Sequence, residues 1–317
     1  MIQDPLIKPT RENPDTWIWM EELNRFYYPP TLTESLGILP TAKSTIPRIE
    51  DLSLPGQGEP YDTCGSEAFF ICLKCDHIEP VIMNCRRSSC PVCYTTWAWI
   101  SARRASLRIL KAPKVFPKEL RRIRKPIHGM ISLPLEYHDL FFNDYPKARK
   151  IAYKLLKKAG FKGGLLIPHP WRQKCFKCGG EIIASWTVSL ESKDFYIKDT
   201  YCVECGSKEF IWEISPHFHT VGYGWVEHTK EIEADTGYVI KNIGIIDNVG
   251  GTIWYLLTHC GIQKGRQTIT YFGLCAYNKY KSPPLEKEGT VICPKCGAFM
   301  IRPGFQSRSG KPPPGGF

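Results

Sequence analysis

The sequence predicts an α+β protein in which a small antiparallel sheet is flanked by helices, with zinc-binding modules placed before this core and inserted into it. Three observations predict this class. Short apolar segments of strand length alternate with amphipathic segments of helical period. Most of the 14 cysteines lie in Cys-x-x-Cys pairs, and Lys plus Arg exceed Asp plus Glu by 42 − 31 = 11. In chain order we expect an N-terminal arm (1–60), a zinc module with a basic helix (61–115), a core (116–282) that contains a zinc ribbon insert (173–207), and a C-terminal cysteine pair with a disordered tail (283–317).

The charge balance and the cysteine content restrict the classes of function. A pI of about 9.0 suits a polyanionic partner such as nucleic acid. No run of about 18 apolar residues occurs, so we expect no membrane-spanning segment, and the first residues lack the basic-then-apolar pattern of a signal peptide. We therefore expect a cytoplasmic protein without a membrane partner, in which cysteines bind metal rather than form disulfides.

The first module contains six cysteines that compete for four places in a zinc site. These are Cys64, Cys72, Cys75, Cys85, Cys90 and Cys93. The Cys-x-x-Cys pairs at 72–75 and 90–93 are 14 residues apart, which is typical of a structural zinc site because the turn of each pair aims two thiolates at one point. We expect Cys72, Cys75, Cys90 and Cys93 to hold one Zn²⁺, although Cys85 could replace a member of the first pair.

A basic helix is predicted directly after this module, over residues 95–111. Its expected apolar stripe consists of Trp97, Ile100, Leu107 and Leu110. Among the remaining positions, Arg103, Arg104 and Arg108 are candidates for contacts with DNA phosphates. The alternative is a solvated charged face with no ligand.

The core begins with a buried strand at 128–134, followed by a second basic helix at 145–159 and another strand at 163–169. A zinc ribbon then interrupts the chain, because two further Cys-x-x-Cys pairs are separated by 23 residues. Its expected ligands are Cys175, Cys178, Cys202 and Cys205. The ribbon lies between the strand that ends at His169 and the strand that carries His217 and His219. If these strands are antiparallel neighbours, His169 returns close to the two later histidines.

The paired histidines form the first candidate catalytic feature. Alternate side chains of a strand point to opposite faces, so His217 and His219 emerge on one face about 7 Å apart and Phe218 points into the core. Two imidazoles in this arrangement could hold one divalent ion. Without a further ligand, the pair could equally be structural.

A helix over residues 250–261, reached through a loop, forms the second candidate feature. Tyr255 and His259 are four residues apart on one side of this helix, and the apolar side lies roughly opposite. A strand at 268–274 follows, then Tyr277 and Tyr280. The pair Cys293-x-x-Cys296 is half of a zinc site, to which Cys275 or Cys260 could contribute.

Taken in order, these stretches resemble the HUH endonuclease superfamily, and within it the rolling-circle replication initiators of archaeal plasmids and viruses. The superfamily signature of His, bulky hydrophobic, His is similar to His217-Phe218-His219, and Tyr255 best matches the nucleophilic tyrosine on a downstream helix. The stretches similar to the initiators are Cys90-Pro-Val-Cys93 with a following Trp, His128-x-x-x-Ser132, His169-Pro-Trp-Arg172, Ser215-Pro-His-Phe-His219 and Tyr255-Leu-Leu-Thr-His259. The resemblance spans roughly residues 64–275. It departs from the commonest Tyr-x-x-Lys motif, because Thr258 stands where the lysine would be.

The resemblance implies a ferredoxin-like or RRM-like core that nicks and rejoins single-stranded DNA through a covalent 5′-phosphotyrosine. It implies Tyr255 and His259 as catalytic residues, Mg²⁺ or Mn²⁺ held by His217, His219 and a third ligand, and a DNA contact by Arg172. His169 is the first choice for that ligand from the hairpin argument. Glu213, Glu209 and His128 are alternatives, and Tyr277 or Tyr280 are rival nucleophiles.

The implied partners are a single-stranded or hairpin origin DNA and host replication proteins, namely a helicase and a polymerase. No Gly-x-x-x-x-Gly-Lys-Ser/Thr loop occurs in the sequence, so we expect unwinding to come from elsewhere. Three alternatives stay open: a related transposase of a mobile element, a non-enzymatic zinc-ribbon protein that binds nucleic acid, and a nuclease that acts through water.

Overall fold

The structure is a computed structural model that describes residues 52–60, 64–123, 125–188, 195–283 and 292–301. It also describes a short pair of strands, β1 (Trp19–Met20) and β2 (Arg25–Phe26). Most of the expected N-terminal arm, and the tail from residue 302, lie outside the described residues. In the part of the chain that is described, no helix combines the length and the apolar character needed to cross a membrane.

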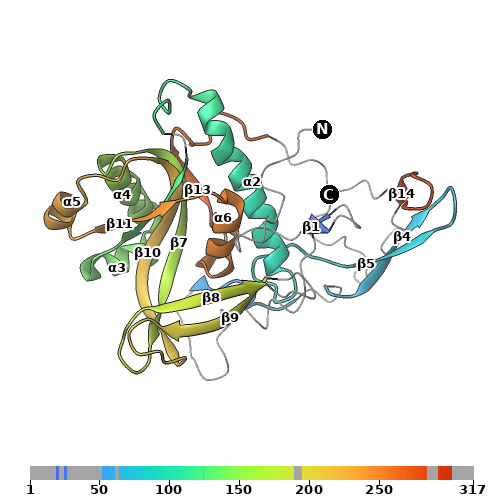
Figure 1. The fold of residues 1–317 in the computed structure, drawn as a ribbon, viewed down its shortest axis with the longest axis horizontal. Coiled ribbons are helices and arrows are strands. Elements are labelled where there is room, and N and C mark those ends of the chain that lie inside the picture. The colour runs from blue at the N-terminus through green and yellow to red at the C-terminus, as the bar shows by residue number, and fades with distance from the viewer. Residues whose placement is uncertain are drawn as a thin grey trace.

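An antiparallel sheet of five strands forms the centre of the molecule (Figure 1). Its order is β11-β6-β10-β7-β13, and every neighbouring pair is antiparallel. The strands are β6 (Ile127–Ser132), β7 (Phe161–Cys175), β10 (Phe210–Gly224), β11 (Val239–Ile245) and β13 (Thr270–Gly273). The histidine strand β10 is therefore central, between the strands that carry His128 and His169.

One face of the sheet is covered by α3 (His138–Asn143), α4 (Tyr145–Lys158) and α5 (Thr229–Thr236). Phe218 points to this side and is completely buried among aromatic and alanine side chains, as strand alternation predicts. The start of α4 is capped by the Asp144 side chain, which accepts from the Lys147 N–H. Helix α5 and strand β11 lie where the sequence predicted only a loop.

The opposite face carries two helices, α2 (Tyr94–Val115) and α6 (Val249–Thr258), which pack against each other and against β7 and β10 (Figure 1). The buried side of α2 consists mainly of Ala98, Ala102, Ala105, Ile109 and Ala112. Small side chains let two helix backbones approach closely, and α6 fills the space with Ile253, Leu256 and Leu257. Of the predicted stripe on α2, Ile100 is buried and Trp97 and Leu110 pack against this cluster while partly exposed, so the stripe is on the core side but the closest contacts are made by the alanines.

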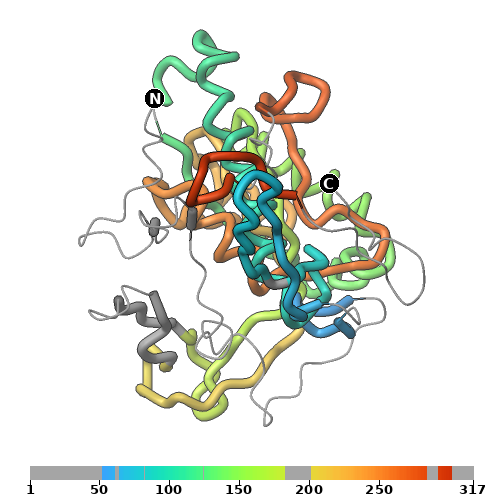
Figure 2. The backbone as a smooth tube through the Cα atoms, turned by 90° about the vertical axis from the view of Figure 1, so that its right-hand side faces the viewer, coloured from blue at the N-terminus to red at the C-terminus, as the bar shows by residue number. Residues whose placement is uncertain are grey.

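Three small β elements extend from this core. Strands β4 (Glu67–Cys72), β5 (Ile78–Ile82) and β14 (Met300–Ile301) form a three-stranded sheet in which residues from the two ends of the described chain lie side by side (Figure 2). Strands β8 (Ile182–Val188) and β9 (Phe195–Cys202) form a hairpin between β7 and β10, where the zinc ribbon was predicted. Finally, β3 (Leu52–Ser53) pairs with β12 (Ile262–Gln263) just after α6.

Candidate active site

Three imidazoles meet on the sheet face that α6 covers. His169 on β7 is paired in register with His217 on β10, and His219 follows two residues later on the same face. One ligand nitrogen from each of these histidines lies within 4.8 Å of the others. The ring centroids of His169 are 5.3 Å from those of His217 and 4.5 Å from those of His219. The antiparallel pairing that the zinc ribbon insertion predicted is thus present, and it brings His169 to the paired histidines.

Hydrogen bonds fix how the three rings are presented. The Nδ1 of His217 donates to the Ser215 carbonyl at 2.6 Å, because a carbonyl can only accept, and this leaves Nε2 of His217 with a lone pair. The Nδ1 of His219 is 2.8 Å from Nε2 of His128. The Nε2 of His169 is buried and has no hydrogen-bond partner. Outer partners of this kind orient the histidines of metal sites, and an orphaned buried nitrogen is expected to have a ligand.

Burial keeps these rings neutral. It lowers the pKa of His217 to about 3 and that of His128 to about 4, and it lowers the pKa of His169 and of His219 well below the ordinary value of 6.5. Nearby histidines and Arg172 add smaller contributions in the same direction. Neutral imidazole is the form that binds metal. The cluster is therefore in its binding form at neutral pH.

The donor set discriminates between the two expected metals. Three neutral nitrogens suit first-row transition ions, whereas Mg²⁺ prefers oxygen ligands and keeps much of its water. The residues fit Mn²⁺ or another transition ion better than Mg²⁺.

The other candidates for a third ligand are engaged elsewhere. Glu213 forms an ion pair with Lys174 at 2.7 Å, and the Glu209 side chain is exposed just before β10, after the last cysteine of the ribbon. Nε2 of His128 lies 2.8 Å from Nδ1 of His219, so His128 orients the His219 ring and is an outer partner of the site. The geometry brings His169, and not Glu209, Glu213 or His128, to the paired histidines as a third donor.

Tyr255 and His259 lie next to this cluster on α6. Their ring centroids are 4.6 Å apart, and the ring of His259 is 4.7 Å from that of His169. His259 therefore lies between the tyrosine and a member of the histidine cluster. Tyr255 is 37% exposed, which leaves it open to a substrate. Burial of the ring nonetheless raises its pKa, so the phenol is protonated at neutral pH and needs a base before it can attack.

The end of α6 explains the departure from the commonest tyrosine motif. Thr258 is buried, and its hydroxyl donates to the Tyr255 carbonyl at 2.7 Å. A lysine at this position would have to be buried without its charge being solvated. Thr258 thus stabilises the last turn, and His259 is the polar residue that faces the cluster. Its pKa is lowered to about 4, mainly by burial.

The alternative nucleophiles, Tyr277 and Tyr280, lie around Arg108. The Tyr280 hydroxyl donates to the Arg108 carbonyl at 2.6 Å, and the ring of Tyr277 is 4.9 Å from that of Tyr271. Both rings contact the Arg108 guanidinium, at 4.5 and 5.1 Å. In the described part of the chain neither has a ring contact with His259 or with the three clustered histidines, whereas the ring of Tyr255 contacts His259.

The four arginines expected to bind DNA divide into different environments. Arg104 is exposed and Arg103 is half-buried on α2. Arg172 reaches back to the cluster, with its Nη2 3.4 Å from the Ser132 hydroxyl. Arg108 is buried, and its guanidinium donates to the carbonyls of Cys275, Ala276 and Tyr280 and to the Ser282 hydroxyl. The prediction that Arg108 contacts DNA is therefore wrong, because its donors are used to hold the 275–282 segment against α2.

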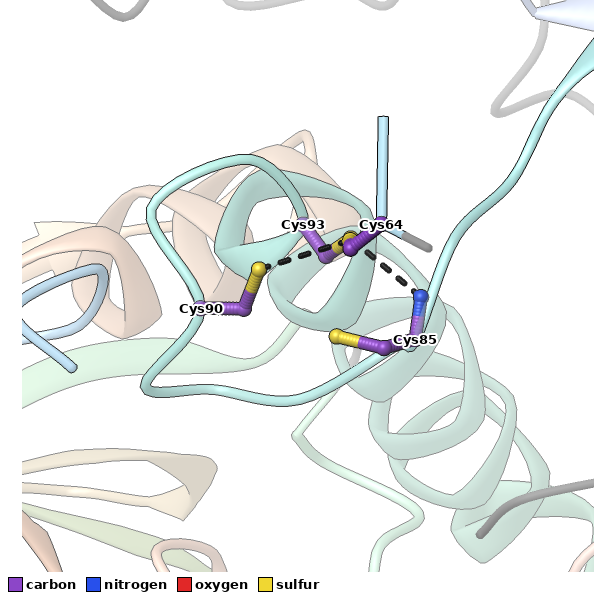
Figure 3. Close-up of side chains that lie close together, drawn as sticks. All are labelled: Cys64, Cys85, Cys90 and Cys93. Atoms are coloured by element: carbon purple, nitrogen blue, oxygen red, sulfur yellow. Dashed lines mark hydrogen bonds between the residues drawn. The ribbon is translucent and has the colours of Figure 1, made fainter. Parts of the chain in front are cut away.

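The first expected zinc site is also wrong as a set, although all four of its cysteines lie in tetrads. Cys90 and Cys93 at the start of α2 meet Cys64 and Cys85 rather than the 72–75 pair. Figure 3 shows these four side chains converging, with Cys64 Sγ 2.7 Å from Cys93 Sγ. A connection of 14 residues allows either pairing, so the spacing alone did not select the partners.

Cys72 and Cys75 instead meet Cys293 and Cys296 from the C-terminal segment. The Sγ atoms of Cys72 and Cys296 are 3.4 Å apart, and those of Cys75 and Cys293 are 3.5 Å apart. This completes the half site that the sequence left open, without Cys260 or Cys275, which are buried elsewhere. The tetrad ties together residues more than 200 positions apart.

The third tetrad is the predicted one, Cys175, Cys178, Cys202 and Cys205. In this tetrad and the second, the second cysteine of each pair precedes a residue with positive φ: Asp76, Gly179, Gly206 and Gly297. That conformation turns the chain so that both thiolates of a pair point to one side. All three tetrads are geometrically compatible with tetrahedral Zn²⁺, one more than the sequence predicted.

Comparisons of the chain with family models, with curated proteins and with solved structures give no match.

Proposed function

We propose that this protein is a metal-dependent endonuclease of the HUH type that nicks and rejoins single-stranded DNA and starts rolling-circle replication. The observation that carries the proposal is the placement of Tyr255 and His259 beside three convergent, neutral histidines. Covalent attack on a phosphodiester requires a nucleophile such as tyrosine, and a divalent ion beside it can neutralise the phosphate.

The sheet order supports an RRM-like or ferredoxin-like core. With the β8–β9 hairpin left aside and α3 and α4 taken together, the chain from β6 to β11 runs strand, helices, strand, strand, helix, strand, and the spatial order of these strands is β11-β6-β10-β7. This order is consistent with the β-α-β-β-α-β arrangement of ferredoxin-like folds, with β13 and α6 in addition. In this arrangement the two central strands, β6 and β10, carry His128 and the paired histidines.

Each residue of the site has a defined task in the proposed reaction. A divalent ion held by His169, His217 and His219 would neutralise a non-bridging phosphate oxygen. The Tyr255 oxygen attacks phosphorus, and the bond from phosphorus to the 3′-oxygen of the preceding nucleotide breaks. The products are a 5′-phosphotyrosine and a free 3′-hydroxyl. His259, which is neutral, accepts the phenol proton and returns it to the leaving oxygen.

The choice of a tyrosine, rather than water, determines what the products can do. The phosphotyrosine preserves the energy of the broken bond, so the reverse attack by a 3′-hydroxyl rejoins the strand without a nucleotide cofactor. The free 3′-hydroxyl can prime a host polymerase while a host helicase separates the strands. The same chemistry would serve a transposase, and the motifs shared with plasmid and virus initiators favour replication.

The test is a covalent-linkage assay with single-stranded DNA labelled at its 3′ end, because the proposed reaction keeps the 3′ fragment on the protein. Strands tiled across the DNA element that encodes the protein are incubated with Mn²⁺ and separated under denaturing conditions. We expect a labelled protein band that disappears in Tyr255→Phe and persists in the matched variant Tyr277→Phe.

Two other results would contradict the proposal. Nicking that survives Tyr255→Phe without a linked band would indicate a nuclease that acts through water. Tight DNA binding without nicking or linkage on any strand would indicate a non-enzymatic binding protein.

A further inference from the structure

A broad cleft of about 990 Å³ opens beside the candidate active site. One wall is the outer side of α2 with the 87–89 loop of the first cysteine tetrad, and the other is the 262–269 segment that links α6 to β13. The short strand β3 pairs with β12 and closes one end. Three separate parts of the chain therefore build this cleft, and we call it the α2 groove.

The α2 groove is strongly basic. Its lining includes Arg87, Arg104, Lys264 and Arg266, and no carboxylate occurs among the described residues that line it. Arg104 and Lys264 are exposed, and within the described ranges neither forms an ion pair. The guanidinium of Arg266 lies over the Tyr145 ring at 5.5 Å, so the positive charge that the groove presents to a ligand comes from Arg87, Arg104 and Lys264. These three come from the tetrad loop, α2 and the 262–269 segment, and they create a local positive potential suited to a polyanion.

The remaining lining residues suit a nucleic-acid strand rather than a small anion. Ser88, Ser89 and Ser101 add hydroxyl groups that can donate to phosphate oxygens. Trp97 and Tyr277 supply aromatic faces, and Tyr277 is 56% exposed. A cationic groove with aromatic platforms is the arrangement that binds single strands without a fixed sequence, because phosphates meet the cations and bases stack on the rings.

The α2 groove begins next to the histidine cluster. Its wall at Ile262 follows Gly261 directly, and the Gly261 N–H donates to the Pro168 carbonyl at 2.8 Å. Pro168 precedes His169, and His259 lies two residues before Gly261. The wall of the groove thus begins three residues after His259 and next to the strand that carries His169.

We propose that the α2 groove binds the single-stranded DNA that flanks the scissile phosphate, with Arg104 and Lys264 contacting its phosphates. The identity of the bound strand as the substrate rests on the proposed function, whereas the binding of single-stranded DNA does not. The proposed site retains one of the arginines that the sequence indicated, Arg104, and adds Lys264 from the segment that links α6 to the last strand of the sheet.

The test is the salt dependence of binding to a fluorescent single-stranded oligonucleotide of about 16 nucleotides. All proteins carry Tyr255→Phe and are measured without added Mn²⁺, so that no cleavage or linkage can disturb the equilibrium. For single strands, each neutralised phosphate contributes about 0.7 to the slope of log K against log salt. The double variant Arg104→Gln/Lys264→Gln should therefore lower the magnitude of the slope by about 1.4.

The matched control is Lys150→Gln/Lys154→Gln, which removes the same charge from the exposed side of α4 on the opposite face of the sheet. We expect its slope to equal that of the parent protein. Equal loss of slope in both double variants would show that only net charge matters and would overturn the α2 groove. No change in the groove variant would overturn it as well.

The results that would contradict the proposed function differ from those that would contradict the α2 groove. Loss of slope in the groove variant, combined with no covalent linkage in the tyrosine assay, would leave the α2 groove as a DNA-binding site on a protein that does not cut. Covalent linkage to Tyr255 combined with an unchanged slope in the groove variant would support the proposed enzyme, but would show that its DNA strand binds outside the α2 groove.

Discussion

Replacing Arg108 separates a structural role from a DNA-binding role more sharply than any other single change. Its guanidinium is buried and donates four hydrogen bonds, to the carbonyls of Cys275, Ala276 and Tyr280 and to the Ser282 hydroxyl, at 2.6 to 3.0 Å. Three tyrosine rings surround it at 4.5 to 5.1 Å. In Arg108→Ala all of these contacts are lost, and the neighbouring Lys111 already donates to the Lys281 carbonyl at 3.0 Å.

The expected loss of stability follows from these contacts. A buried acceptor that loses its partner costs about 1–3 kcal/mol, and a desolvated cation–π contact contributes about 1 kcal/mol or more. Three carbonyls at the low end of this range, plus one ring contact, give about 4 kcal/mol. For a protein of 317 residues we expect Tm to fall by about 6 °C. The Tm of Arg108→Lys should lie between those of the parent and Arg108→Ala, since an ammonium keeps the charge but cannot reach all four acceptors.

The assay is thermal unfolding beside single-strand binding, with Arg104→Ala as the control. Arg104 lies one turn earlier on the same helix but is exposed, so its removal should change stability by less than about 0.5 kcal/mol while weakening DNA binding. The reasoning is refuted if Arg108→Ala keeps the parent Tm and weakens DNA binding as Arg104→Ala does.

Three further predictions address the metals and the buried histidines. The purified protein should contain three zinc ions per chain by elemental analysis, and Cys293→Ser should remove one; two ions in both proteins would disprove the tetrad with Cys72 and Cys75. His217→Ala should weaken Mn²⁺ binding in calorimetry by well over tenfold, and His128→Ala by about 10–100-fold as an outer partner, with zinc content unchanged; equal affinity in all three proteins would show that the ion binds elsewhere. Burial holds the pKa of His217 at about 3 and that of His259 at about 4, whereas both have a pKa near 6.5 in the unfolded chain. Below pH 6.5 the unfolded chain therefore binds more protons than the folded protein, and the folded state loses stability. Without added Mn²⁺, each histidine should cost about 1 kcal/mol between pH 6 and pH 5, and a Tm that stays constant over this range would contradict the burial of the cluster.

The parts of the site that the sequence predicted are those fixed by local periodicity. Alternation on β10 determines that His217 and His219 share a face, and helical period determines that Tyr255 and His259 share a side of α6. The position of His169 could also be predicted, because an insertion between two strands makes them neighbours in a hairpin. The third cysteine tetrad followed from the spacing of its two Cys-x-x-Cys pairs.

The parts that the sequence did not predict depend on contacts between distant segments. The choice of Cys293 and Cys296 as partners of Cys72 and Cys75 requires β14 to pair with β4, which no spacing rule indicates. Arg108 was expected to be available to DNA, whereas the 275–282 segment, distant in sequence, packs over it and accepts its hydrogen bonds. Strand β11 was missed because it is a largely exposed edge strand and therefore lacks a strong apolar alternation.

Identification of the residue that carries DNA is the most direct test of the central proposal. After reaction with single-stranded DNA and Mn²⁺, the protein is digested with nuclease and trypsin and its peptides are analysed by mass spectrometry. The tryptic peptide that spans residues 242–264 contains Tyr255 as its single tyrosine, so a nucleotide on that peptide identifies the nucleophile without further mapping. We predict a nucleotide 5′-phosphate on this peptide, and a nucleotide on the 267–279 peptide or on Tyr280 instead would contradict the assignment of the active site to the histidine cluster.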